Sequence, residues 1–149
     1  MVTRILLLIL LSSRVVFAGP TTRVSLGPGG VQANGPSAGP SVSGDRRFVV
    51  FYSDASNLVA DDTNGVGDIF VHDRATGTTE RVSVGPGGAE THSGNGQLYY
   101  AHPAISADGR FVAFQSVADD LVAGDSNLAD DVFVRDRLAS VTSRVSVGP

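Results

Sequence analysis

The sequence predicts an all-β fold in which one four-stranded antiparallel unit occurs twice. The chain matches itself without a gap when residues 43–86 are laid on residues 106–149, a shift of 63 residues, and about 25 of the 44 aligned pairs are identical. Each copy contains short runs of β-branched and aromatic residues separated by turn-forming residues. No window shows a persuasive helical period, so the repeated unit is expected to be a set of strands.

Four strands are expected in each copy. The first copy places them at residues 40–42, 48–52, 69–72 and 80–84, and the second copy repeats the first three at 103–105, 111–115 and 132–135. The second strand of each copy is apolar with little alternation, which is typical of a strand covered on both faces. Sheets that are buried on both sides describe the blades of a β-propeller better than the strands of a sandwich. Residues 22–26 match the fourth strand and are expected to form one extra outer strand.

The repeats are too few for a closed ring. A closed propeller has typically about four to eight blades, whereas this chain supplies blade one (40–84), blade two (103–147) and the extra strand. We therefore expect an incomplete β-propeller over residues 19–149, either as a fragment of a longer propeller or as a piece that assembles into a ring. Its uncovered blade faces predict self-association when the chain is expressed alone.

Short motifs in both blades resemble the TolB-like repeat, a WD-like propeller blade of exported bacterial proteins. They are SGDRRFVVF from Ser43 with SADGRFVAF from Ser106, DIFVHDR from Asp68 with DVFVRDR from Asp131, and an RVS triplet near the end of each copy. The resemblance covers residues 22–149 and implies either a binding platform or an accessory domain of a peptidase. Blade one departs from the pattern at Arg46, where the turn glycine is expected.

The first 18 residues have the order of a secretory signal peptide. Arg4 precedes the apolar residues 5–11, and the segment ends in Val-Phe-Ala at residue 18. The apolar run is too short for a membrane span, which needs about 20 residues. We expect an exported protein, periplasmic or extracellular; an uncleaved anchor or a mistaken start codon is the alternative.

The composition limits the possible partners. The chain has 15 acidic residues, 11 basic residues, a formal net charge of -4 and no cysteine. No cluster of basic residues would attract nucleic acid, and no cysteine could form a disulfide, a thiolate metal site or a nucleophile. The expected partners are further propeller blades or another protein, and no nucleic acid.

Two acidic loops between the second and third strands are the candidate metal sites. Their shared pattern places oxygen ligands at positions 1, 3 and 7 of a short loop, namely Asp62, Asn64 and Asp68 in blade one and Asp125, Asn127 and Asp131 in blade two. This spacing is similar to the opening of a calcium loop, so Ca²⁺ is the expected cation. The alternative is that these side chains cap their own turns and that the last aspartate simply begins the third strand.

An aromatic group in the second blade-to-blade crossing is the candidate ligand contact. Tyr99, Tyr100 and His102 occur where the first crossing is shorter and has no aromatic residue. Exposed tyrosines could anchor a peptide or a sugar ring; alternatively they cover the end of the neighbouring blade.

No catalytic set is expected. The three histidines do not recur in the repeat, and the chain has no Gly-x-Ser-x-Gly elbow. We expect an exported, non-catalytic repeat module that serves as a binding platform for a protein or another ligand. The alternative is the accessory propeller of a larger secreted hydrolase or peptidase whose catalytic domain is not in this chain; a ring-forming, lectin-like oligomer is a third class.

Overall fold

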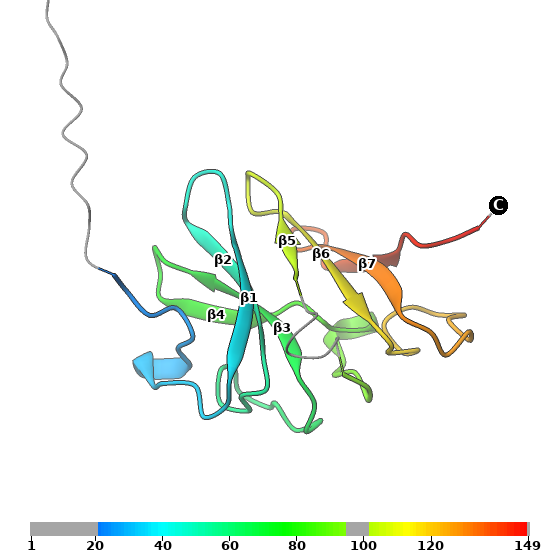
Figure 1. The fold of residues 1–149 in the computed structure, drawn as a ribbon, viewed down its shortest axis with the longest axis horizontal. Helices are drawn as coiled ribbons and strands as arrows, with labels where there is room; N and C mark the ends of the chain where they lie inside the picture. Colours follow the sequence, from blue (N-terminus) through cyan, green and yellow to red (C-terminus); the bar gives the residue numbers. More distant parts are fainter. Residues whose placement is uncertain (1–20, 95–101, 149) are drawn as a thin grey trace, which may run out of the picture.

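The computed structural model describes residues 21–94 and 102–148, which form two four-stranded antiparallel sheets (Figure 1). The first sheet contains β1 (Ser37–Val42), β2 (Phe48–Ser53), β3 (Asp68–Asp73) and β4 (Thr78–Arg81), in that order. The second contains β5 (Ala104–Ile105), β6 (Phe111–Ser116), β7 (Asp131–Asp136) and β8 (Val141–Arg144). The predicted all-β fold with two sheets of the same topology is confirmed.

The two sheets also share their strand pairing. Phe48 pairs with Asp73 and Ser53 with Asp68 between β2 and β3, and the equivalent residues pair between β6 and β7. Strands that follow one another in sequence are neighbours in each sheet, so both sheets are simple meanders. Four-stranded antiparallel meanders that pack face to face are the blades of a β-propeller. We call β1–β4 blade one and β5–β8 blade two; the prediction of an incomplete propeller made of two blades is confirmed.

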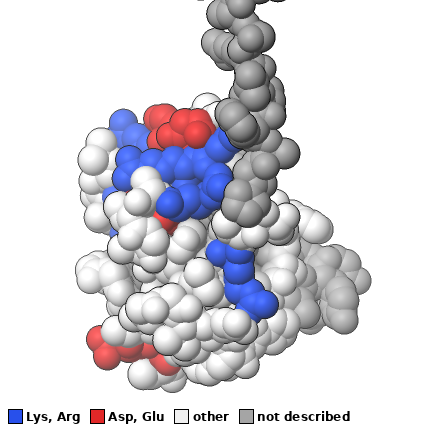
Figure 2. All heavy atoms as spheres, turned by 90° about the vertical axis from the view of Figure 1, so that its left-hand side faces the viewer, with Lys and Arg blue, Asp and Glu red and all other residues white. Residues whose placement is uncertain are grey.

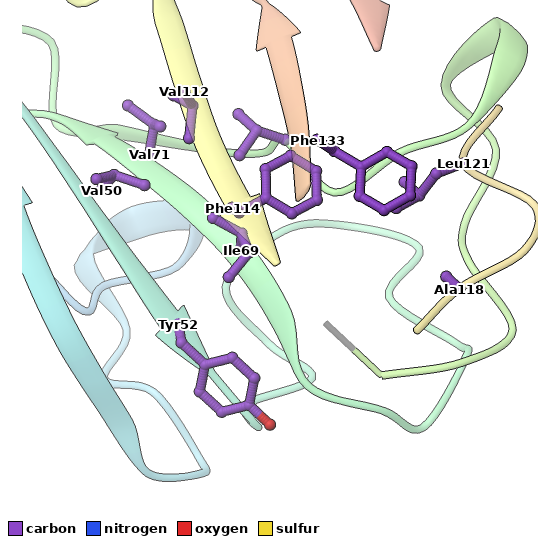
Figure 3. Close-up of a cluster of buried hydrophobic side chains, with 10 residues drawn as sticks. Val50, Tyr52, Ile69, Val71, Val112, Phe114, Ala118, Leu121 and Phe133 are labelled. Atoms are coloured by element: carbon purple, nitrogen blue, oxygen red, sulfur yellow. The ribbon is translucent and has the colours of Figure 1, made fainter. Parts of the chain in front are cut away.

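The main apolar core lies between the two blades (Figure 3). Blade one contributes Val50, Tyr52, Ile69, Val71 and Val82, and blade two contributes Val112, Phe114, Ala118, Leu121 and Phe133. None of these side chains is more than 4% exposed. Burying a large apolar side chain contributes about 1.5–3 kcal/mol, so this interface is the main attraction between the blades.

The second strand is covered on both faces only in blade one. Every β2 residue after Phe48 is buried, whereas β6 alternates between buried and exposed positions. On blade two, Phe111, Val132 and Val145 are 39%, 43% and 51% exposed. The reason is that the described chain covers blade two on one face and leaves its other face open.

Residues 22–26 do not form the extra outer strand that the sequence predicts. Among them only Leu26 takes part in a β-bridge, which pairs it with Gln32 in the following turn. A fourth strand needs a third strand beside it, and the described chain places none there. The segment instead contacts blade one through the Leu26 carbonyl, which accepts a hydrogen bond from Thr79 Oγ1 (2.6 Å). Ala33, which follows the turn η1, packs on a second apolar cluster. That cluster contains Phe51, Ala55, Leu58 and Phe70.

The fourth strand of blade one lies slightly earlier than the predicted 80–84. The Val82 N–H still donates to the Ile69 carbonyl (2.8 Å), but Ser83 Oγ accepts the Ile69 N–H (3.0 Å). A side chain therefore replaces the next bond of the ladder, and β4 ends at Arg81. Blade two ends its fourth strand in the same way, with Ser146 Oγ on the Val132 N–H (3.0 Å).

The two ends of the blades differ in the length of their loops. The hairpin turns after β1 and β5 lie at the top of Figure 1, and the long connections lie at the opposite end. On the face shown in Figure 2, arginine side chains gather toward the tight-turn end. The crossings into the two blades contain the short 3₁₀ turns η1 (Pro28–Gly30) and η2 (Pro86–Gly88). No helix among the described residues is long and apolar enough to cross a membrane.

Candidate functional site

The predicted ligands of the blade-one acidic loop lie close together, around the guanidinium group of Arg81. Arg81 Nη1 is 3.3 Å from Asp62 Oδ1 and 3.3 Å from Asp68 Oδ2. The side chains of Arg81, Asp62 and Asp68 are 9%, 3% and 0% exposed, so this ion cluster is largely withdrawn from water. Arg81 is the last residue of β4. It follows Asp68 by 13 residues in the sequence but contacts it in the structure. The positive charge at the centre of the loop is thus a side chain of the protein.

Hydrogen bonds fix the shape of this loop. Asn64 Nδ2 donates to Asp68 Oδ2 (3.0 Å), and Asn64 Oδ1 accepts the N–H of Val66 (3.2 Å). Ser83 Oγ donates to Asp68 Oδ1 (2.6 Å). These are the contacts of a capped turn whose last aspartate is anchored to the outer strand.

The acidic loop of blade two repeats this arrangement. Arg144 Nη1 is 2.6 Å from Asp125 Oδ1 and 3.3 Å from Asp131 Oδ2. Asn127 Nδ2 donates to Asp131 Oδ2 (2.9 Å), and Ser146 Oγ donates to Asp131 Oδ1. The repetition shows that the Arg-centred loop belongs to the blade itself.

The carboxylates that are predicted to bind calcium contact an arginine side chain in both loops. A Ca²⁺ ion prefers six to eight oxygen ligands, and here the carboxylates already bind a guanidinium group. Within residues 21–94 and 102–148, no group of three or more His, Cys, Asp or Glu side chains is arranged to hold a metal ion. Calcium binding by Asp62, Asn64 and Asp68 and by their blade-two equivalents stays a prediction.

The last aspartate of the loop has a different pKa shift in each blade. The pKa of Asp68 is raised by desolvation in the covered blade, and the pKa of Asp62 is raised by its own burial and by the nearby charge of Asp68. In the open blade, hydrogen bonds from Ser146 and Asn127 lower the pKa of Asp131. The Asp131 carboxyl group therefore holds its charge more easily than the equivalent carboxyl group of Asp68.

A third carboxylate joins the blade-one cluster from the crossing into blade two. Glu90 Oε1 accepts the Thr63 N–H (2.8 Å) and lies 2.7 Å from Arg81 Nη1, and Glu90 Oε2 accepts a hydrogen bond from Thr63 Oγ1 (2.6 Å). These bonds from Thr63, together with Arg81, lower the pKa of Glu90 to about 2. The sequence analysis missed this site because Glu90 lies in a Gly-rich segment outside the repeated strands.

The same crossing also contacts the loop between β6 and β7 of blade two. We call this loop, and the equivalent loop between β2 and β3, the insertion of its blade. The His92 N–H donates to Asp120 Oδ2 (2.9 Å), and His92 Nδ1 lies 2.5 Å from the same oxygen. The crossing into blade one makes the equivalent contact, from the Asn34 N–H to Asn57 Oδ1 (2.9 Å). Crossings and insertions therefore meet at one end of the blades, where the sequence places all the long loops.

Of the predicted aromatic ligand contact, the structure describes only His102. Tyr99 and Tyr100 lie outside the described residues. His102 is exposed and immediately precedes the buried Pro103. Ligand contact by Tyr99, Tyr100 and His102 stays a prediction.

At the tight-turn end, Phe48 of blade one lies against the turn of blade two. A side-chain carbon on Gly109 would be 2.2 Å from Phe48 Cδ2, so only glycine leaves room for the ring. The guanidinium carbon of Arg137 lies 4.4 Å from the centre of the same ring, and Arg137 also pairs with Glu80 of blade one. Two backbones meet nearby, where the Gly44 N–H donates to the Ala107 carbonyl (2.9 Å).

On the far side of blade two, the equivalent surface is open. Phe111, the counterpart of Phe48, borders a shallow groove of about 470 Å³. The groove is also lined by Val134, Asp136, Ala139, Val141, Ser143 and Val145. Two of its apolar residues, Val134 and Val145, are more exposed than their blade-one equivalents Val71 and Val82, which are buried.

Two meander sheets of the same topology that pack face to face define this chain as part of a β-propeller. Among solved structures, it is similar to TolB from Acinetobacter baumannii (16% identity, TM-score 0.48, 78% of this chain and 22% of that chain). It is also similar to a protein described as TolB from Agrobacterium tumefaciens (19%, 0.47, 76% and 31%). The β-propeller domain of the Trilobed protease from Pyrococcus furiosus is a third similar structure (15%, 0.45, 74% and 27%).

This chain spans less than a third of the length of each of these three structures. No family model matches it, and no curated protein matches it.

Proposed function

We propose that this chain is an exported, non-catalytic β-propeller module whose open blade-two face binds a further blade of the same repeat. One observation carries the proposal: the face exposes side chains that are equivalent to the blade-one side chains buried against blade two. Val82 is 1% exposed and its equivalent Val145 is 51% exposed. Phe48 packs on the turn of the next blade, whereas its equivalent Phe111 is 39% exposed. An apolar surface of this kind is typical of an interaction site.

The interface between the two blades describes the chemistry of the expected partner. Phe48 needs a glycine in the facing turn, so Phe111 needs a partner turn like the one at Gly109. The apolar side chains of blade one meet Leu121 and Phe133, so the groove beside Val145 calls for a leucine and a phenylalanine at equivalent places. A further blade with the same pattern supplies all of these groups.

The first experiment lengthens the chain by one repeat. A copy of residues 87–149 is joined after Pro149, so that the repeat continues in register. The added blade should cover Phe111 and its neighbours; we expect a monomer that binds less hydrophobic dye and melts at a higher temperature than the original chain. The matched control carries Gly109→Val in the added copy only, where the new side chain collides with Phe111.

The outcomes separate the possible occupants of the face. Equal dye binding in the original, the extended and the control chain would overturn the proposal. If the original chain forms concentration-dependent oligomers that Phe111→Asp abolishes, the occupant is a second copy of the chain, measured by light scattering. Export has its own test, because cleavage after Ala18 and release from the cell are visible by mass spectrometry of the secreted protein.

A further inference from the structure

The contact between Glu90 and blade one has an unfilled equivalent on blade two. We propose that Ser126 and Arg144 form a carboxylate-binding site that accepts a glutamate side chain from the segment leading to the next blade. The inference rests on the proposed function, because that segment is what connects blade two to the blade on its open face.

The blade-one contact serves as the template. Three groups hold Glu90: the N–H and the hydroxyl group of Thr63, at 2.8 and 2.6 Å, and the guanidinium group of Arg81, at 2.7 Å. Both carboxylate oxygens are used, which fixes the side chain in orientation as well as in position. Glu90 reaches this place because Val84 pairs with it across the turn η2.

Blade two has the same loop with the same backbone shape. Gly65 and its equivalent Leu128 both have a left-handed φ, of 70° and 53°. Asp61 and its equivalent Gly124 likewise have φ values of 60° and 79°. Since the loop bends in the same way on both sides of residue 126, the Ser126 N–H takes the place of the Thr63 N–H. Serine also keeps the hydroxyl group that threonine uses.

The blade-two groups are available for a ligand. Ser126 is exposed and makes no hydrogen bond within residues 21–94 and 102–148, whereas Thr63 makes two to Glu90. The Arg144 side chain is 23% exposed, compared with 9% for Arg81. In that part of the chain Arg144 binds Asp125 and Asp131 but has no third carboxylate.

The charges around the site favour a carboxylate over a phosphate group. Asp125 and Asp131 already lie beside Arg144, and a doubly charged ligand would be repelled by both. A singly charged carboxylate is held mainly by directional hydrogen bonds from Ser126, as Glu90 is held by Thr63. Residues 145–149 repeat residues 82–86, so a glutamate nine residues after Arg144 would arrive as Glu90 does.

The test adds only the segment that carries the glutamate. The complete chain is extended after Pro149 by Gly-Gly-Ala-Glu-Thr, a copy of residues 87–91, and the matched control has glutamine in place of the added glutamate. We expect the Ser126 amide signal in NMR spectra to move with the ionisation of the added glutamate, and the pKa of that group to fall below 4.5, as that of Glu90 does. The glutamate chain should melt about 2–4 °C above the glutamine chain. Ser126→Ala should remove part of both effects.

An added glutamate that titrates at its ordinary pKa, with the Ser126 signal unchanged, would overturn the inference. The Ser126→Ala variant removes only the hydroxyl group. Arg144 still neutralises Asp125 and Asp131 in this variant, so the loop is expected to keep its fold. This result is independent of the docking of a whole blade. In the chain that is lengthened by a whole repeat, glutamine can replace the added copy of Glu90. The added blade should still cover Phe111 in that chain, so either proposal can fail without the other.

Discussion

Gly109 closes the turn between β5 and β6, and its replacement by alanine should strongly destabilise the pair of blades. Its φ is +74°, a left-handed conformation that costs an L-residue about 1 kcal/mol or more. The new Cβ would also lie 2.2 Å from Phe48 Cδ2, and forcing a methyl group into a filled space costs about 1–3 kcal/mol. We expect a total loss of about 2–4 kcal/mol in the free energy of unfolding. For a domain of this size, that lowers the melting temperature by roughly 7–15 °C.

Gly77→Ala is the matched control for this prediction. Gly77 has nearly the same φ, +72°, but a Cβ there would meet no atom within 4 Å. Alanine at Gly77 therefore brings the backbone strain without the collision. Urea unfolding of both variants separates the two costs, and equal losses would refute the reasoning that Phe48 needs an empty place at Gly109.

Three further predictions follow from the loops. Leu128→Gly should raise the free energy of unfolding by about 0.5–1 kcal/mol, measured by urea unfolding, because Leu128 has a left-handed φ of 53° and is 81% exposed. The lowered pKa of Glu90 stabilises the fold above pH 4.5, and this contribution is lost as the pH falls toward about 2. Glu90→Gln should therefore make the free energy of unfolding depend less on pH across that range. An unchanged slope of this free energy against pH would contradict the prediction. If the acidic loops bind calcium, the melting temperature should be higher in millimolar Ca²⁺ than in Mg²⁺ or chelator. Identical melting curves in all three would show that Arg81 and Arg144 are the cations of the loops.

The repeat made the strands predictable, because every local pattern occurs twice at the same spacing. In each loop, the two aspartates that the sequence analysis names contact one arginine side chain. The sequence could not show what lies between them, since Arg81 belongs to an RVS triplet that looks like ordinary strand sequence. Only the strand pairing, which puts Arg81 opposite Phe70, carries the guanidinium group to Asp68.

The misplaced outer strand has a different physical reason. Residues 22–26 have the same sequence pattern as the fourth strand, and a strand pattern gives no information about its partner. Without a third strand beside it, the segment is held on blade one through the Leu26 carbonyl, which accepts a hydrogen bond from Thr79 Oγ1. Local sequence thus predicts the tendency to pair, and long-range contacts decide whether pairing occurs.

The arginine at the centre of each acidic loop is a counter-charge that is covalently attached to the protein. A guanidinium group keeps its proton across the whole biological pH range, and its attachment to the outer strand means that dilution or a chelator cannot remove it. A propeller that relied on a bound ion for the same contacts would loosen whenever that ion became scarce. Each blade therefore carries a counter-charge for its own acidic loop, and that charge comes from the end of its own outer strand.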